Sequence, residues 1–241
     1  MKTISEKIAV LAEKPRYDFE DLIDLVQVLR SEQGCPWDRE QDHKSIRSSV
    51  IEETYEVVEA IDNEDTTLLR EELGDLLFQV MFHTQLEREK GTFEIDDVIH
   101  DLCYKMIHRH PHVFGSVEVE NSTEVLSNWE KIKTVEKQRN TLVDKLRAIP
   151  PMMPALMRAS KVGKKAGRAA GEDASALLDR LEEEIRQARA ALETEDMDAG
   201  VTVGEILMST TDLARALGVD AEYALTGRIE ALIDEVAQKN G

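Results

Sequence analysis

The chain of 241 residues has few of the residues that cross-link or interrupt a fold: two cysteines, six prolines and 12 glycines. Cys35 and Cys103 are too few for a disulfide framework, and reduced thiols are the default in the cytoplasm. So few glycines and prolines argue against an all-β protein, which needs many turns. No apolar run is long enough to span a bilayer, and we expect no signal peptide. A cytoplasmic protein is expected.

Positive charge is also scarce, because 49 Asp and Glu residues stand against 30 Lys and Arg residues. The net charge of −19 argues against nucleic acid or an anionic membrane as a partner. Charged residues make up 33% of the chain and hydrophobic residues 41%, the balance of a globular rather than a disordered protein. A phosphorylated ligand would need a metal ion as intermediary.

Long stretches of Ala, Leu, Glu, Arg and Lys at helical spacing predict an all-α fold. One helix is expected between Asp18, as its cap, and Gly34. In the segment GCPWD that follows, Pro36 should fix a turn and Trp37 should anchor the loop against the core. The other expected helices cover residues 4–14, 42–62, 66–90, 96–109, 121–139 and 155–170. A proline-rich linker is expected at 141–154.

Two of these helices carry carboxylates at a spacing that groups them. Glu53 and Glu56 stand at i,i+3 in EETYE, and Glu72 and Asp75 stand at i,i+3 in EELGD. Residues at this spacing share one helix face. If the two helices form an antiparallel hairpin, the four carboxylates face one another.

The second helix makes this more than a run of charge. Its apolar residues from Leu73 to Phe82 lie all round a helical wheel, which predicts a helix buried on every side. Its polar residues Glu72, Asp75, Gln79 and His83 share one narrow arc. A carboxylate buried there must be protonated, salt-bridged or bound to a metal. We favour a metal over an ion pair, because Arg70 lies off the arc. For the first helix a solvated acidic face remains the alternative.

The second half of the chain repeats this arrangement with a broken ligand set. EEIRQ follows EETYE at an offset of 131 residues, and GEILM follows GDLLF at an offset of 130. Gln187 stands at the position of Glu56 and Thr202 at that of Glu72, while Glu184 and Glu205 keep their charge. The second half is expected to retain the scaffold without the site.

Five motifs together resemble the MazG family of all-α nucleoside triphosphate pyrophosphohydrolases: GCPWD at 34–38, EETYE at 52–56, EELGDLLFQV at 71–80, KMIHRHPHVFG at 105–115 and WEKIK at 129–133. The resemblance covers the first 140 residues closely and continues as a tandem arrangement. It implies a MazG-like catalytic domain over 1–140, the linker at 141–154, and a degenerate, structural or dimerising MazG-like domain over 155–241.

The resemblance also implies an activity: hydrolysis of a nucleoside triphosphate to the monophosphate and pyrophosphate with Mg²⁺, for which Mn²⁺ can substitute. Carried over by position, the metal ligands are Glu53, Glu56, Glu72 and Asp75. Lys105 and Arg109 would hold the phosphates, while Trp129 and Lys133 would contact the nucleotide. The family further implies a homodimer.

A carboxylate outside the ligand set, Glu52 first, could orient or deprotonate the attacking water. Trp129 could stack on any base, which suits broad specificity and a role in cleaning the nucleotide pool. Two other classes stay open. One is a non-catalytic helical scaffold that dimerises or binds a partner. The other is a di-iron bundle, which needs Glu-x-x-His pairs and finds only Asp97 with His100 here.

Overall fold

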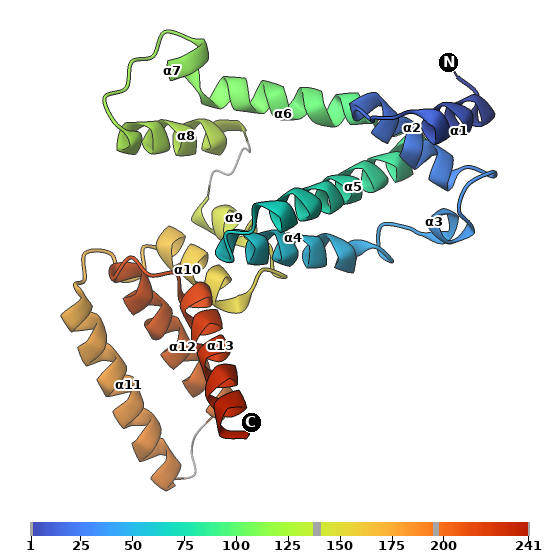
Figure 1. Ribbon diagram of the computed structural model, residues 1–241. Helices are drawn as coiled ribbons and strands as arrows, with labels where there is room; N and C mark the ends of the chain where they lie inside the picture. The colour runs from blue at the N-terminus through green and yellow to red at the C-terminus, as the bar shows by residue number, and fades with distance from the viewer. Residues whose placement is uncertain (1, 137–140, 195–197, 241) are drawn as a thin grey trace. The chain divides into compact units, whose positions relative to one another are not determined.

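The computed structural model describes residues 2–136, 141–194 and 198–240, and within them the protein is entirely α-helical (Figure 1). The predicted all-α fold is confirmed. The helices are α1 (Ile4–Glu13), α2 (Phe19–Arg30), α3 (Pro36–Glu40), α4 (Arg47–Asp62), α5 (Thr66–Lys90), α6 (Ile95–Arg109), α7 (Pro111–Phe114), α8 (Ser122–Glu136), α9 (Leu142–Arg147), α10 (Ala155–Ala166), α11 (Ala174–Thr194), α12 (Ala199–Ala216) and α13 (Ala221–Asn240).

Two compact units make up the chain, Met1–Val125 and Leu126–Gly241, and the division falls within α8. The predicted linker at 141–154 contains the short helix α9, which Thr141 caps with its side chain. The predicted division into 1–140, 141–154 and 155–241 stays a prediction. No helix in the described part of the chain is both long enough and apolar enough to cross a membrane.

The hairpin of α4 and α5 is the largest feature of the first unit, and both ends of α5 follow from the sequence. At its start the Asp65 carboxylate accepts the backbone N–H groups of Thr67 and Leu68. At its end Gly91 adopts the left-handed conformation, with φ of 72°, that favours glycine. The predicted helix at 66–90 is therefore confirmed at both ends.

The partner helix α4 starts at Arg47, later than the predicted start at residue 42. The Asp42 carboxylate accepts the N–H groups of Lys44 and Ser45 at 2.8 and 2.9 Å. This turn satisfies backbone donors without a helix, which is how a short polar side chain competes with helix formation.

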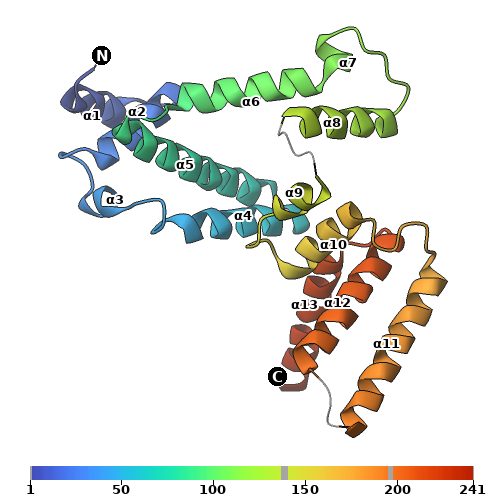
Figure 2. The same cartoon turned by 180° about the vertical axis from the view of Figure 1, so that it is seen from behind.

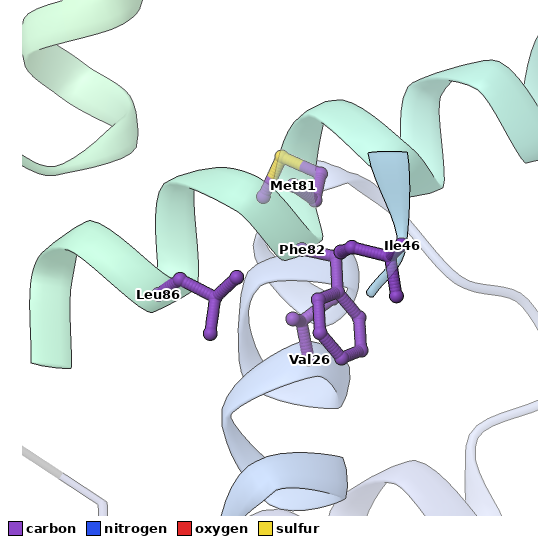
Figure 3. Packing of buried hydrophobic residues seen from close by; sticks show 5 residues of the cluster. All are labelled: Val26, Ile46, Met81, Phe82 and Leu86. Carbon is purple, nitrogen blue, oxygen red and sulfur yellow. The ribbon is translucent and has the colours of Figure 1, made fainter. Parts of the chain in front are cut away.

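The core of the first unit lies where α2 crosses α5 (Figure 3). Its five buried side chains are Val26, Ile46, Met81, Phe82 and Leu86. The Arg30 guanidinium lies over the Phe82 ring at 5.2 Å and donates to both carboxylate oxygens of Glu89. This contact fixes the C-terminal half of α5 against α2.

The GCPWD segment is held differently from the prediction. Trp37 is 62% exposed, so it does not anchor the loop against the core. Arg30 does so instead, donating from Nη1 to the carbonyl oxygens of Asp38 and Gln41. Gly34 lies so close to the end of α2 that an added Cβ would meet the Val28 carbonyl oxygen at 2.0 Å. A larger residue cannot occupy this position without moving the backbone.

The expectation that α5 is buried on every side is wrong for its N-terminal half. Leu73, Leu77 and Val80 are 49%, 40% and 43% exposed. The fully buried positions of α5 lie from Met81 onward, apart from Glu72. Within the described part of the first unit, α4 packs along the N-terminal half of α5, whereas α2 and α6 meet α5 nearer its C-terminal end (Figures 1 and 2). Part of the surface that the wheel pattern predicts to be buried is therefore exposed.

In the second unit, α10 packs against α9, α12 and α13, and α11 pairs with α12. The α11–α12 pair corresponds to α4–α5, as the internal repeat predicts. The basic helix expected over 155–170 ends earlier, at Ala166, because Gly167 caps it in the left-handed conformation with φ of 72°. Arg168 lies just beyond this cap.

We predict that Phe82→Ala lowers the free energy of unfolding by about 3–5 kcal/mol, because it removes a buried ring and leaves a cavity at the α2–α5 crossing. Urea denaturation followed by circular dichroism measures this change. Met152→Ala, at a position that is 77% exposed, is the matched control and should change stability by less than about 0.5 kcal/mol. Equal effects of both substitutions would contradict this assignment of the core.

Candidate metal centre

The α4–α5 hairpin brings three of the four predicted carboxylates together. One oxygen atom each from Glu53, Glu56 and Glu72 lies within 4.8 Å of the others. The i,i+3 spacing places the first two on one face of α4, and Glu72 enters from α5. Glu72 is 9% exposed, while Glu53 and Glu56 are half-buried.

Asp75, the fourth carboxylate, is exposed on α5, so the prediction that it is buried is wrong. The N-terminal half of α5 is open to solvent here, because α2 and α6 pack against α5 only nearer its C-terminal end. The charge of Asp75 nevertheless raises the pKa values of both Glu53 and Glu72. It therefore acts electrostatically on the cluster from its edge.

The electrostatics of the cluster are unfavourable in the absence of a cation. Burial raises the pKa of the Glu53 carboxyl, and the neighbouring Glu56 and Asp75 raise it further. Burial likewise raises the pKa of Glu72, followed by the charges of Glu56 and Asp75. Among the residues that the structure describes, no lysine or arginine pairs with these four carboxylates. A set of oxygen donors with excess negative charge fits a hard divalent cation such as Mg²⁺.

Gln79 is a neighbour of the cluster whose contact the sequence did not specify. It lies on the predicted polar arc of α5, and its Nε2 donates to Glu53 Oε1 at 3.3 Å. One oxygen of Glu53 is thereby oriented by a neutral donor. Hydrogen bonds of this kind fix a ligand's direction without adding charge.

The same arc continues into a pair of histidines. His83 Nδ1 lies 2.8 Å from His43 Nδ1, and the two rings are stacked. His43 Nε2 in turn lies 2.6 Å from Glu87 Oε1. Hydrogen bonds from Lys90, Thr92 and His43 lower the pKa of Glu87 to about 2. The sequence gives no signal for the contacts of His43, because this residue precedes α4 and belongs to no periodic pattern.

The other five predicted site residues are not members of the group of three carboxylates. Lys105 is exposed and Arg109 is buried on α6, which begins beside the C-terminal end of α5 and diverges from it (Figures 1 and 2). Trp129 and Lys133 are half-buried on the part of α8 that belongs to the second unit. Glu52 is exposed on α4 next to Glu53. The roles predicted for these five residues stay predictions.

An all-α protein with a carboxylate cluster on a helical hairpin is the class that fold and site define. The family model of the MazG nucleotide pyrophosphohydrolase domain matches residues 41–114, from the turn before α4 to the end of α7. The match includes the three clustered carboxylates, Lys105 and Arg109. It ends before Trp129 and Lys133 and before the second unit.

Full-length relatives extend this match. The chain is 36% identical over 231 residues to the nucleoside triphosphate pyrophosphohydrolase/pyrophosphatase MazG of Thermotoga maritima, covering 92% of this chain and 88% of the relative. It is 41% identical over 211 residues to the nucleoside triphosphate pyrophosphohydrolase of Escherichia coli K12, covering 85% and 80%. The Mycobacterium tuberculosis protein of that name is 37% identical over 153 residues, covering 60% and 46%. The chain belongs to the MazG family of hydrolases.

The raised pKa values predict how stability depends on pH without metal. The folded state holds protons on Glu53 and Glu72 more tightly than the unfolded chain does, so stability falls as the pH rises from about 4.3 through the folded pKa values. Glu56→Gln removes a charge that contributes to both shifts. In EDTA, this variant should therefore have a higher melting temperature than the wild type at pH 7, with a smaller difference at pH 4.

Glu59→Gln removes an exposed charge from the same helix and is the matched control. It should have the same small effect at both pH values. If Glu56→Gln also gave the same difference at pH 4 and pH 7, the repulsion within the cluster would be refuted. Differential scanning calorimetry gives both comparisons.

Proposed function

We propose that this protein hydrolyses nucleoside triphosphates to the monophosphate and pyrophosphate, with Mg²⁺ held by Glu53, Glu56, Glu72 and Asp75 and with Mn²⁺ as a substitute. The observation that carries this is the grouping of Glu53, Glu56 and Glu72 within 4.8 Å, with no lysine or arginine of the described residues paired with them. The names of the relatives from Thermotoga maritima and Escherichia coli support the reaction.

The chemistry follows from what a triphosphate and a carboxylate cluster share. Both are rich in negatively charged oxygen, and bound Mg²⁺ would neutralise the two sets together. Glu53, Glu56 and Glu72 supply ligand oxygens from two rigid helices, and Gln79 keeps the Glu53 carboxylate in one orientation. Asp75, exposed at the edge, is available to the phosphate side of the site.

The other predicted residues take complementary roles in this proposal. Glu52 is exposed next to the cluster, where it can orient or deprotonate the attacking water. Arg109 suits a bidentate phosphate contact and Lys105 a point charge. Trp129 would stack on the base and Lys133 would contact the nucleotide, which supports broad base specificity and a house-cleaning role in the cytoplasm. The free cysteines Cys35 and Cys103 accord with a reducing compartment.

The Asp97 carboxylate caps helix α6, which argues against the di-iron alternative. Its carboxylate accepts the Glu94 backbone N–H at 2.8 Å, as part of the box that caps α6. His100, the other member of the pair, stacks on Tyr104. A carboxylate used as a helix cap is a poor candidate for a bridging iron ligand. The non-catalytic scaffold remains the alternative that the activity assay decides.

The exposed apolar side chains of the hairpin support a homodimer. Leu73, Leu77 and Val80 on α5 and Ile51 and Tyr55 on α4 are each at least 40% exposed. Apolar surface grouped on one pair of helices is typical of a protein–protein interface. We propose that a second copy of the chain covers it, which would also bury the part of α5 that carries Glu72 and Asp75.

Glu56→Ala should lower Mg²⁺-dependent pyrophosphate release by at least about 100-fold, because it removes a charged ligand. Asp75→Ala should have the same effect, while circular dichroism shows unchanged helix content. Phosphorus NMR identifies the product: pyrophosphate supports the proposal, whereas orthophosphate alone or no turnover by the wild type refutes it. Glu205→Ala changes the residue equivalent to Asp75 in the second unit, and this control should retain full turnover.

Leu77→Arg places a charge within the exposed apolar surface of the hairpin and should convert the dimer to a monomer, because a desolvated unpaired charge is costly at an interface. Sedimentation velocity measures the mass directly. Leu192→Arg introduces the same residue at a position that is 62% exposed in the second unit, and it should leave the dimer intact. Dimerisation that survives Leu77→Arg but not Leu192→Arg would place the interface elsewhere.

A further inference from the structure

The second unit preserves the contact that orients the first carboxylate of the metal centre. In the first unit, Gln79 Nε2 donates to Glu53 Oε1 at 3.3 Å. In the second unit, Ser209 Oγ donates to Glu184 Oε1 at 2.7 Å. Glu184 and Ser209 are the repeat equivalents of Glu53 and Gln79, at offsets of 131 and 130 residues. The α11–α12 pair therefore forms a hydrogen bond between the same two repeat positions that are linked in α4–α5.

Room for an ion also persists in the second unit. A cavity of about 320 Å³ between α11 and α12 is lined by Glu184, Thr202 and Glu205, the equivalents of Glu53, Glu72 and Asp75. The Oε2 atom of Glu184 is buried and accepts no hydrogen bond within the described residues. A metal ion retained in the second unit would be coordinated by this oxygen. The two units therefore differ in which positive group, if any, neutralises their carboxylates.

A guanidinium group supplies the positive charge in the second unit. Arg168 Nη2 donates to Ser209 Oγ at 3.2 Å and lies 3.7 Å from Glu205 Oε2. Its Nε donates to Asp212 Oδ2 at 2.5 Å. Arg168 thus contacts Glu205 directly and is linked to Glu184 through Ser209. The first unit has no cationic side chain in the equivalent place among the described residues.

The ion pair with Asp212 holds Arg168 in this position. This carboxylate is 1% exposed, and it stands at the repeat position of the core residue Phe82. Arg215 lies 3.0 Å from its Oδ1 and Arg180 lies 3.9 Å from its Oδ2, in addition to Arg168. A buried carboxylate requires paired cations. The Asp that stands at the repeat position of Phe82 is therefore accompanied by three arginines, close to the residues equivalent to the first unit's carboxylates.

We propose that Arg168 replaces the divalent cation in the second unit, so that this unit binds no metal and folds independently of it. Arg168 and Arg215 pair with the buried Asp212, and Arg168 also lies near Glu205, while Arg180 pairs with Glu172 as well as with Asp212. A divalent ion bound by Glu205 in this cavity would be repelled by the Arg168 guanidinium, which lies 3.7 Å from Glu205 Oε2. The donor set accordingly does not fit the metal that the first unit's carboxylates fit.

Binding of Mn²⁺ to the full chain, followed by the electron paramagnetic resonance of free Mn²⁺, tests this. The Glu53→Gln/Glu56→Gln variant disables the first centre. In this variant the second unit should bind no Mn²⁺. Adding Glu205→Gln should then change nothing. Mn²⁺ bound by the double variant and lost on adding Glu205→Gln would overturn the proposal. Neither result requires nucleotide turnover, so the proposal stands or falls separately from the proposed function.

A second measurement addresses the arginine itself. Arg168→Met should lower the melting temperature by roughly 5 °C in EDTA, because Asp212 and Glu205 lose a paired cation. Arg186→Met is the matched control, since Arg186 has a side chain 75% exposed and pairs only locally with Glu183. It should leave the melting temperature within about 1 °C of the wild type. An unchanged melting temperature for Arg168→Met would also overturn the proposal.

Discussion

Repulsion among carboxylates on the α4–α5 hairpin is the constraint to which the rest of the first unit responds. Glu53, Glu56 and Glu72 lie within 4.8 Å of one another, and burial together with neighbouring charge raises the pKa values of Glu53 and Glu72. Such a cluster persists only if other contacts hold the two helices in place. Those contacts lie further along α5, where Phe82 and Leu86 pack against α2 and Arg30 binds Glu89. The well-packed C-terminal half of α5 thus positions the N-terminal half, where the carboxylates repel one another.

Most helices and the identity of the cluster could be predicted from the sequence because they depend on local spacing. The caps Asp18, Asp65 and Gly91 define helix ends by hydrogen bonds within a few residues. The i,i+3 spacing of Glu53 and Glu56 fixes a common face whatever surrounds it. The hairpin then follows from the short polar connection between the two helices.

The predictions that failed depend on what lies against a helix, which spacing does not specify. The apolar wheel of Leu73–Phe82 indicated burial on every side, yet Leu73 and Leu77 are exposed because α2 reaches only the later turns of α5. Trp37 was expected to anchor its loop, but Arg30 holds the loop through backbone carbonyls instead. His43 was missed because it lies in a turn. Each error concerns a contact made outside the residue's own helix, which the spacing within a helix does not specify.

The two units show two solutions to one electrostatic problem. Both place a glutamate on the first helix of a pair and orient it with a neutral donor from the second, through Gln79 in one case and Ser209 in the other. In the first unit no lysine or arginine among the described residues pairs with these carboxylates, which fits the proposed binding of a divalent cation. In the second unit Arg168 supplies a charge that cannot dissociate. An arginine side chain is covalently attached, so it stabilises the carboxylates permanently but cannot exchange as the metal ion of a metal-dependent enzyme does. The loss of the residues equivalent to Glu56 and Glu72 is therefore consistent with the gain of Arg168.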